Sequence, residues 1–241
     1  MLSPAGSVLD QGFAVVPDLI DGPTATHLAE AVDRATEAAG TLRRDDAVYG
    51  MRDLLRSVPE VRALAGSAVI LDQVEAILGP GAFAVRGLWF DKTPEANWGV
   101  PWHQDLTIAV AEQVDTPGFG PWTVKAGINH VRPPVAVLEA MVTVRVHLDD
   151  CGAGRGPLRV VPGSHREGRL DVAATRGWLD RDSAVDCLVG RGGAVLMRPL
   201  LLHSSRAALE PDRRRVIHLE YAAGPLPGGL PWFEVVGRTA P

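Results

Sequence analysis

His103 and Asp105 stand out because two ligand-type residues interrupt a stretch, residues 101–110 (PWHQDLTIAV), that otherwise reads as a buried strand. Successive side chains of a strand alternate between faces, so His103 and Asp105 point the same way and Gln104 points the opposite way. Burying an ionised carboxylate beside an imidazole is costly unless a metal ion or a tight hydrogen-bonded pair compensates. The pair alone therefore leaves two interpretations open, a structural His–Asp hydrogen bond and part of a metal site.

A third ligand would distinguish these interpretations. The candidates are His130, His147, His165, His203 and His218. His203 has the most favourable context, because it closes the apolar run AVLMRPLLLH (194–203) and would lie at a strand end beside a cavity. Its distance from Asp105 along the chain suits strands that are remote in sequence and adjacent in a barrel. His147 is expected to be a core or cavity-lining residue, and His165, in a turn, a structural cap.

Two histidines and one carboxylate on one face of a metal ion form the arrangement typical of non-haem Fe(II) oxygenases. Three protein ligands leave three positions, which a bidentate 2-oxo acid and O₂ can occupy together. The distal carboxylate of a 2-oxo acid needs a cationic anchor, and arginine offers a planar pair of donors and a permanent charge. Arg214 is the candidate, since a turn and a return strand after His203 would bring it back beside the metal. Arg213 and Arg215 are expected to be solvated edge residues.

The elements that must position these residues follow from the periodicity of the chain. Residues 21–39 predict an amphipathic helix with Asp21 as N-cap and Gly40 as a stop, and residues 58–78 predict a second helical region interrupted near Gly66. Short runs bounded by Gly and Pro then predict strands at 83–92, 102–110, 141–150, 157–164, 192–205 and 213–223. Several strands after two helices favour a mainly β fold with N-terminal helices, a jelly roll or barrel.

A single domain over residues 1–241 is expected, with 1–81 as mostly helical support and 82–222 as the jelly-roll core. Residues 112–134 stand apart, because this stretch is rich in Gly and Pro and too long for a simple strand connection. Loops of that size inside a compact domain are usually functional or disordered. Trp122, Phe119 and Lys125 favour an ordered active-site lid over a floppy linker.

The composition excludes several classes of protein. Hydrophobic residues make up 46% and charged residues 22% of the chain, so neither disorder nor a membrane span is predicted. A net charge of -5 argues against a general nucleic-acid binder, which needs a concentrated basic surface. Cys151 and Cys187 form no CxxC pair, so neither a disulfide framework nor a thiolate zinc site is predicted. The N-terminus lacks the pattern of a secretory signal, and a cytoplasmic protein is expected.

Taken together, these motifs resemble the phytanoyl-CoA dioxygenase family of Fe(II)/2-oxoglutarate-dependent oxygenases. The resemblance covers roughly residues 85–222 and rests on WHQD (102–105), HLDDCGAGRGPLRVVPGSH (147–165), HSS (203–205), Arg214 and Tyr221. It implies a double-stranded β-helix fold and iron bound by His103, Asp105 and His203. It also implies that Arg214, assisted by Ser205, binds the distal carboxylate of 2-oxoglutarate.

The implied reaction is hydroxylation of an unactivated C–H bond of a small molecule, with O₂ and 2-oxoglutarate consumed and succinate and CO₂ released. Related halogenases carry Gly or Ala in place of the carboxylate, so Asp105 favours hydroxylation over halogenation, while desaturation and ring closure stay open. Two hypotheses from other classes are a non-catalytic jelly-roll module that binds a metal or ligand, and a cupin-like metalloenzyme that does not use 2-oxoglutarate.

Substrate contacts are predicted from aromatic and cationic residues near these motifs. They are Lys92, Trp98, Trp102, Trp122, Lys125 and Arg145. The set suits a small molecule with an apolar body, with or without one anionic group. Each tryptophan could instead pack in the core. Lys92 could contact the substrate, contact 2-oxoglutarate, or be exposed to solvent. The oligomeric state is not predicted, and neither a nucleic-acid nor a membrane partner is expected.

Overall fold

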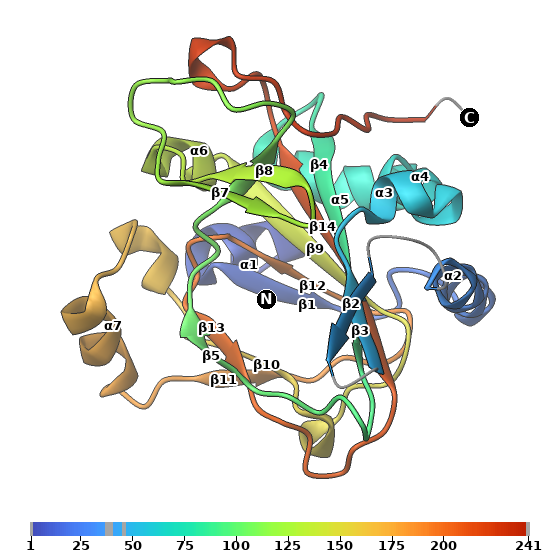
Figure 1. The fold of residues 1–241 in the computed structure, drawn as a ribbon. Helices are drawn as coiled ribbons and strands as arrows, with labels where there is room; N and C mark the ends of the chain where they lie inside the picture. Colours follow the sequence, from blue (N-terminus) through green and yellow to red (C-terminus); the bar gives the residue numbers. More distant parts are fainter. Residues whose placement is uncertain (1, 37–40, 45–46, 240–241) are drawn as a thin grey trace.

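The computed structural model describes residues 2–36, 41–44 and 47–239, and its strands form three antiparallel sheets (Figure 1). The seven-stranded sheet has the order β1 (Phe13–Val16), β12 (Ala194–Met197), β9 (Met141–His147), β14 (Arg214–Ala222), β4 (Phe83–Lys92), β3 (Ala47–Met51) and β2 (Thr41–Arg44). The four-stranded sheet has the order β11 (Val185–Cys187), β10 (Leu158–Val160), β13 (His203–Ser205) and β5 (Val100–His103). The three-stranded sheet has the order β6 (Ile108–Val110), β8 (Ile128–Val131) and β7 (Trp122–Lys125).

The two larger sheets enclose a cavity, because side chains of β4, β9 and β14 line it from one sheet and side chains of β5, β10 and β13 from the other. This is the predicted double-stranded β-helix. Strand alternation separates the two faces of the large sheet. On β9, Val142, Val144 and Val146 belong to the main apolar core, whereas Arg145 lines the cavity.

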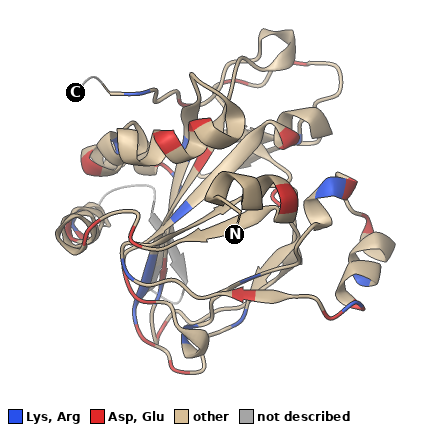
Figure 2. Cartoon of the chain, turned by 180° about the vertical axis from the view of Figure 1, so that it is seen from behind, with Lys and Arg blue, Asp and Glu red and all other residues tan. Residues whose placement is uncertain are grey.

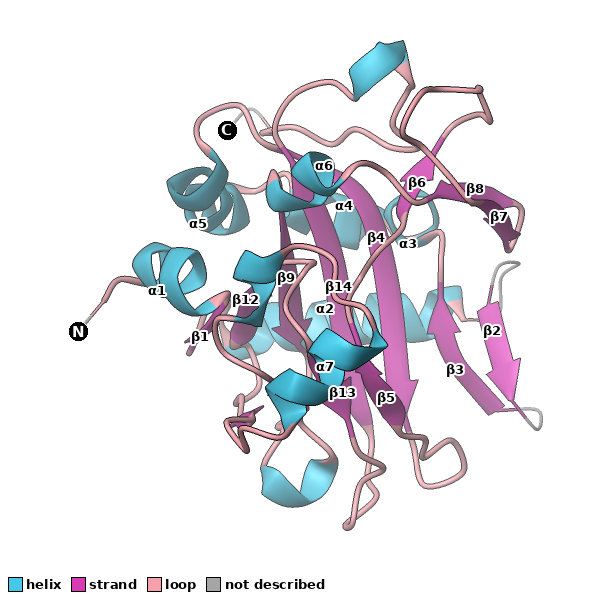
Figure 3. Ribbon diagram, turned by 90° about the vertical axis from the view of Figure 1, so that its left-hand side faces the viewer, coloured by secondary structure: helices cyan, strands magenta, loops and turns pink. Residues whose placement is uncertain are grey.

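Helices cover the outer face of the seven-stranded sheet (Figure 3). They are α1 (Pro4–Gln11), α2 (Gly22–Ala35), α3 (Leu54–Ser57), α4 (Pro59–Ala65) and α5 (Ala68–Leu78). The remaining helical segments lie in connections, namely α6 (Val135–Glu139), α7 (Val172–Leu179) and the 3₁₀ turns η1 (Ala153–Arg155), η2 (Ser164–Glu167) and η3 (Pro227–Gly229). Tyr221, fully buried in the core, donates from its hydroxyl to the carbonyl oxygen of Ala65 at 3.0 Å and so joins α4 to β14.

Both predicted helical regions are present. Asp21 caps α2, since its carboxylate accepts from the backbone N–H of Thr24 at 2.8 Å. The helix ends at Ala35, and the expected stop at Gly40 lies outside the described residues. The second region divides into α4 and α5 at Gly66, as predicted.

Two of the predicted strands are each broken in two. Residues 192–205 form β12 and β13, because Pro199 has no backbone N–H to donate to a ladder. Residues 102–110 form β5 and β6, because the N–H of Asp105 donates to the carbonyl oxygen of Pro199 at 2.9 Å instead of to a strand. The N-terminal region adds strands that were not predicted, with β1 pairing with β12 and β3 with β4.

Residues 112–134, predicted as a lid loop, contain the hairpin of β7 and β8. Its two turn residues, Ala126 and Gly127, have φ values of 50° and 76°, the left-handed pair typical of a tight hairpin turn. β8 also pairs with β6. Residues 122–131 of the segment therefore form an ordered hairpin, and closure over a substrate stays a prediction.

Arg213 and Arg215, which were expected to be solvated edge residues, both form ion pairs; the side chain of Arg213 is still 41% exposed, whereas that of Arg215 is only 16% exposed, so the expectation was wrong for Arg215. Arg213 bridges Asp33 of α2 and Asp91 of β4 at 2.6 and 2.8 Å. Arg215 lies 2.9 Å from Asp33 and 2.7 Å from Asp149. These pairs attach α2 to the ends of the central strands β4 and β14, and strand alternation gives no signal for such contacts.

Charged residues of both signs are interspersed over the helices and loops on the side shown in Figure 2. Within the described residues, no helix combines the length and the apolar character that crossing a membrane requires.

Candidate active site

His103, Asp105 and His203 converge at the place where β5 and β13 pair. His103 at the end of β5 lies opposite His203 at the start of β13, and their ring centroids are 4.1 Å apart. The Nε2 atoms of His103 and His203 lie 3.8 and 3.7 Å from the two carboxylate oxygens of Asp105. One ligand atom from each residue lies within 4.8 Å of the others, and in the described part of the chain no other group of three such residues meets this condition.

Both histidines are held in the orientation that a metal ligand needs. The Nδ1 of His103 lies 2.8 Å from the carbonyl oxygen of Pro101, and the Nδ1 of His203 lies 2.8 Å from that of Leu201. A carbonyl oxygen only accepts, so each Nδ1 carries the proton and each Nε2 keeps its lone pair. The lone pairs and the carboxylate of Asp105 are thus directed to one point, as a divalent metal requires.

Gln104, which lies between His103 and Asp105 in the chain, anchors both ligands through hydrogen bonds on the opposite face. Its Nε2 donates to the carbonyl oxygens of Gly168 and Leu200 at 2.8 and 2.6 Å, and its Oε1 accepts from the N–H of Leu170 at 2.8 Å. Gln104 faces away from His103 and Asp105, as predicted, although these residues no longer belong to one continuous strand.

The charge states of the ligands suit a metal at neutral pH. Burial lowers the pKa of His203 to about 4, so its imidazole is neutral and able to coordinate. Burial raises the pKa of Asp105, but the histidines around it, His203 first, outweigh this effect and lower it to about 2, which leaves the carboxylate ionised. One Asp105 oxygen, Oδ2, is buried without a hydrogen-bond donor, which is costly for a carboxylate unless a cation binds there.

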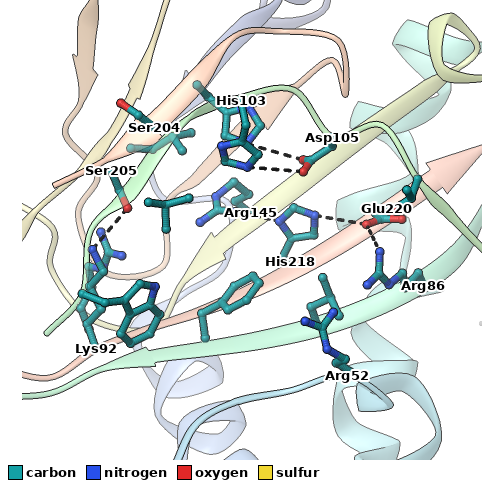
Figure 4. Close-up of a pocket in the computed structure, with 18 of the residues that line it drawn as sticks. Arg52, Arg86, Lys92, His103, Asp105, Arg145, Ser204, Ser205, His218 and Glu220 are labelled. Atoms are coloured by element: carbon teal, nitrogen blue, oxygen red, sulfur yellow. Dashed lines mark hydrogen bonds and ion pairs between the residues drawn. The ribbon is translucent and has the colours of Figure 1, made fainter. Parts of the chain in front are cut away.

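The cavity in which these ligands lie measures about 250 Å³ (Figure 4). Six cationic side chains line it, namely Arg52, Arg86, Lys92, Lys125, Arg145 and Arg214. Only two carboxylates line it, those of Asp105 and Glu220. The cavity is therefore built to receive anions.

One end of the cavity brings together Lys92, Ser205 and Arg214. Lys92 and Arg214 are directly opposite each other on β4 and β14, and both are buried. The Nζ of Lys92 donates to the hydroxyl of Ser205 at 3.3 Å and to the carbonyl oxygen of Arg206 at 2.7 Å. Arg214 donates to the carbonyl oxygen of Gly156. Burial and the adjacent Arg214 charge lower the pKa of Lys92 to about 7.

A chain of polar contacts crosses the floor of the cavity from Arg86 to Arg145. Arg86 lies 3.0 Å from Glu220, and the Nε2 of His218 lies 3.6 Å from the same carboxylate oxygen. Arg145 donates to the Nδ1 of His218 at 2.7 Å, so the proton of that imidazole is on Nε2, facing Glu220. His218, a candidate third ligand from the sequence, thus belongs to this chain and not to the metal group.

The predicted substrate contacts divide into two groups. Lys92, Trp98, Lys125 and Arg145 line the cavity. Trp102 lies on the opposite face of β5, 5.3 Å from Arg159, beside a separate small cavity. Trp122 packs against an apolar cluster formed largely around β6, β8 and the C-terminal segment. Neither of these two tryptophans reaches the cavity, because alternation along β5 and β7 turns their side chains elsewhere.

Four ionisable residues of the cavity were not predicted as substrate contacts from the sequence, namely Arg52, Arg86, His218 and Glu220. Strand alternation would have indicated three of them. Arg86 lies on the same face of β4 as Lys92, and His218 and Glu220 lie on the same face of β14 as Arg214. Arg52 follows β3 and reaches the cavity only through the pairing of β3 with β4, which has no local signal.

The three other candidate histidines contribute no metal ligand. His130 and His147 are buried, and burial lowers their pKa values to about 4 and about 3. His165 is half-buried, and burial lowers its pKa as well. None of the three belongs to the metal group of the described residues.

Comparison with known proteins gives both a family and a fold. A sequence model described as phytanoyl-CoA dioxygenase matches residues 8–216. The chain matches no curated protein. Among solved structures, EctD from S. alaskensis with bound Fe is 18% identical with a TM-score of 0.75, and the match covers 98% of this chain and 85% of that one.

Two further structures from other systems have the same fold. SnoK, a non-heme alpha ketoglutarate dependent carbocyclase from nogalamycin biosynthesis, is 18% identical with a TM-score of 0.70, over 92% of this chain and 84% of that one. HygX from Streptomyces hygroscopicus, solved with nickel and 2-oxoglutarate, is 20% identical with a TM-score of 0.64, over 92% of this chain and 87% of that one. At these identities the structural likeness establishes the fold.

Proposed function

The chain belongs to the phytanoyl-CoA dioxygenase family, and from this we propose that it uses Fe(II), 2-oxoglutarate and O₂ to hydroxylate a C–H bond of a small molecule. Succinate and CO₂ are the expected co-products. One observation carries the proposal: His103, Asp105 and His203 place three ligand atoms within 4.8 Å in a cavity whose end holds Arg214.

The metal ligands proposed are His103, Asp105 and His203. Two neutral imidazoles and one carboxylate on one side suit Fe(II) and leave positions for exogenous ligands. When bound, iron and 2-oxoglutarate together supply the oxidising power, through oxidative decarboxylation of the 2-oxo acid with O₂. The protein supports this chemistry by keeping both imidazoles in the Nδ1-protonated form and the carboxylate ionised.

The co-substrate site proposed is the end formed by Arg214, Ser205 and Lys92. A guanidinium, a hydroxyl and an ammonium group suit a carboxylate that accepts several hydrogen bonds. The Lys92–Ser205 contact of 3.3 Å and the position of Arg214 directly opposite Lys92 support one ligand shared by these donors. The Asp105 carboxylate in the metal group supports hydroxylation, since the family's halogenating relatives lack it.

The test is turnover of 2-oxoglutarate by the full chain loaded with Fe(II) under anaerobic conditions and then exposed to O₂. We expect succinate formation and inhibition by the unreactive analogue N-oxalylglycine. Arg176→Gln, a change on the exposed face of α7, is the matched control and should leave turnover unchanged. If the protein binds Fe(II) but binds neither 2-oxoglutarate nor N-oxalylglycine, a metal-binding module or a different metalloenzyme replaces the present proposal.

A further inference from the structure

The charge of the cavity exceeds what iron and 2-oxoglutarate require. Six cationic side chains and a divalent metal carry eight positive charges, whereas two carboxylates and the 2-oxoglutarate dianion carry four negative ones. Even with Lys92 neutral, which its pKa of about 7 permits, three positive charges remain. Unpaired charge in a partly enclosed site is unfavourable, so a further anion belongs in the cavity.

The surplus lies on the side of the metal group away from the co-substrate end. In Figure 4, Lys92 and Ser205 lie on one side of His103 and Asp105, and Arg52, Arg86 and Glu220 lie on the other. In the function proposed above, 2-oxoglutarate uses one carboxylate at the metal and the other at Arg214. Neither carboxylate of 2-oxoglutarate then neutralises the cations on the side of Arg52 and Arg86.

Three elements contribute cations to that side. Arg52 follows β3, Arg86 lies on β4, and Lys125 ends β7. Glu220 pairs with Arg86 at 3.0 Å, but within the part of the chain that the structure describes no carboxylate lies within 4 Å of the charged groups of Arg52 or Lys125. Burial lowers the pKa of Lys125, and the neighbouring Arg52 and Arg86 lower it further. Asp105 and Glu220 act in the opposite direction on the pKa of Lys125, so three like charges lie near two carboxylates, one of which belongs to the metal group.

The wall between the two cationic ends is apolar. Leu88 and Phe90 lie on the same face of β4, between Arg86 and Lys92, and both line the cavity. A molecule that contacts Arg52 and Lys125 would thus lay its carbon skeleton along Leu88 and Phe90, close to the metal group.

We infer that Arg52 and Lys125, with Arg86, form an anion subsite for the primary substrate, which is a small molecule with an apolar body and a carboxylate or phosphate group. This inference rests on the proposed function, because the co-substrate must fill the opposite end of the cavity. Arg86 and Glu220 position the subsite, and Arg52 and Lys125 supply the uncompensated charge.

The experiment uses the full chain loaded with Ni(II) and saturated with 2-oxoglutarate, so that the co-substrate end is filled. Three probes of similar shape are titrated by calorimetry: 3-phenylpropanoate, phenyl phosphate and the neutral 3-phenylpropanamide. We expect one of the anions to bind at one site at least about tenfold more tightly than the amide, as charge-assisted hydrogen bonds require. The tighter anion identifies carboxylate or phosphate as the group recognised.

Variants locate the binding. Arg52→Gln and Lys125→Gln should each weaken anion binding about tenfold and affect 2-oxoglutarate binding less, whereas Arg176→Gln should change neither. Cooperative thermal unfolding of each variant shows that it is folded. The inference is overturned if the anions bind the loaded protein no more tightly than the amide, or if both variants bind them as the wild type does. Absence of 2-oxoglutarate binding in the first titration is a separate result, which rejects the proposed function.

Discussion

Replacement of Arg214 by glutamine tests the co-substrate site most directly. Arg214 is 6% exposed, faces the cavity from β14 and lies opposite Lys92. Its guanidinium also donates to the carbonyl oxygen of Gly156, a contact that the shorter glutamine amide would lose. We expect the variant to fold, because the change removes a charge from a cationic cluster.

The expected loss of affinity follows from the hydrogen bonds involved. A hydrogen bond between charged partners is worth about 1.5–3 kcal/mol. Its removal therefore raises the Kd for 2-oxoglutarate about ten- to 150-fold. Turnover at saturating 2-oxoglutarate should change much less, since the metal ligands are untouched.

The titration of Lys92 predicts that the effect of Arg214→Gln on the Kd depends on pH. Burial and then Arg214 lower the pKa of Lys92 to about 7, so at pH 8 roughly one Lys92 in ten is protonated in the free wild type. Without Arg214 the pKa rises, and Lys92 regains charge at that pH. The ratio of the Kd of Arg214→Gln to that of the wild type should accordingly be smaller at pH 8 than at pH 6.

The assay is calorimetric titration of anaerobic, metal-loaded protein with 2-oxoglutarate at the two pH values. Arg215→Gln is the matched control, because Arg215 is adjacent in sequence but faces away and pairs with Asp33 and Asp149. We expect its Kd to stay close to that of the wild type. Equal Kd values for Arg214→Gln and the wild type, or an equal loss in both variants, would refute the assignment of Arg214.

Three other predictions follow from single groups. Asp105→Ala should weaken Fe(II) binding by at least about 100-fold and abolish coupled succinate formation, because loss of even a hydrogen-bond partner of a metal ligand lowers metal affinity about 10- to 100-fold. Metal titration and product analysis check this, and unchanged iron affinity would contradict it. The wild type should bind 2-oxoglutarate less tightly as pH rises from 6 to 8, since Lys92 loses its proton near pH 7. In Lys92→Met the Kd for 2-oxoglutarate should change less with pH, and a wild-type Kd that does not change with pH would count against a role for Lys92. Tyr221→Phe should lower the free energy of unfolding by about 1 kcal/mol, because the buried carbonyl of Ala65 loses its donor, and denaturant unfolding measures this.

Two of the three metal ligands, His103 and Asp105, could be predicted from the sequence because they are close together in the chain. Both line the cavity although β5 ends at His103, and His203 was selected because it closes an apolar run and would lie at a strand end. The fold class was also accessible, since the strands at 83–92 and 213–223 have clear boundaries and the structure confirms them as β4 and β14 within one or two residues.

The substrate side could be predicted only in part. Lys125 was expected to contact substrate and lines the cavity, although it lies in a hairpin and not in a loop, whereas Arg52 reaches the cavity through the pairing of β3 with β4, for which the sequence has no signal. Trp102 was expected near the substrate because it adjoins His103, yet adjacent residues in a strand face opposite sides. Tertiary pairing decided these positions, and the pairing of β5 with β13 likewise brings His203 to His103, whereas residue spacing indicated only the His103–Asp105 pair.

The amide of Gln104 joins the segments around residues 168–170 and 200, so the loops on both sides of the metal group are fastened by the protein's own hydrogen bonds. In small zinc domains the metal is needed for folding, and removing it unfolds the chain. Here the hydrogen bonds of Gln104 fix these loops without a metal ion, so we expect metal loading to follow folding. Iron that is oxidised or lost would then be replaced by fresh Fe(II) while the barrel stays folded.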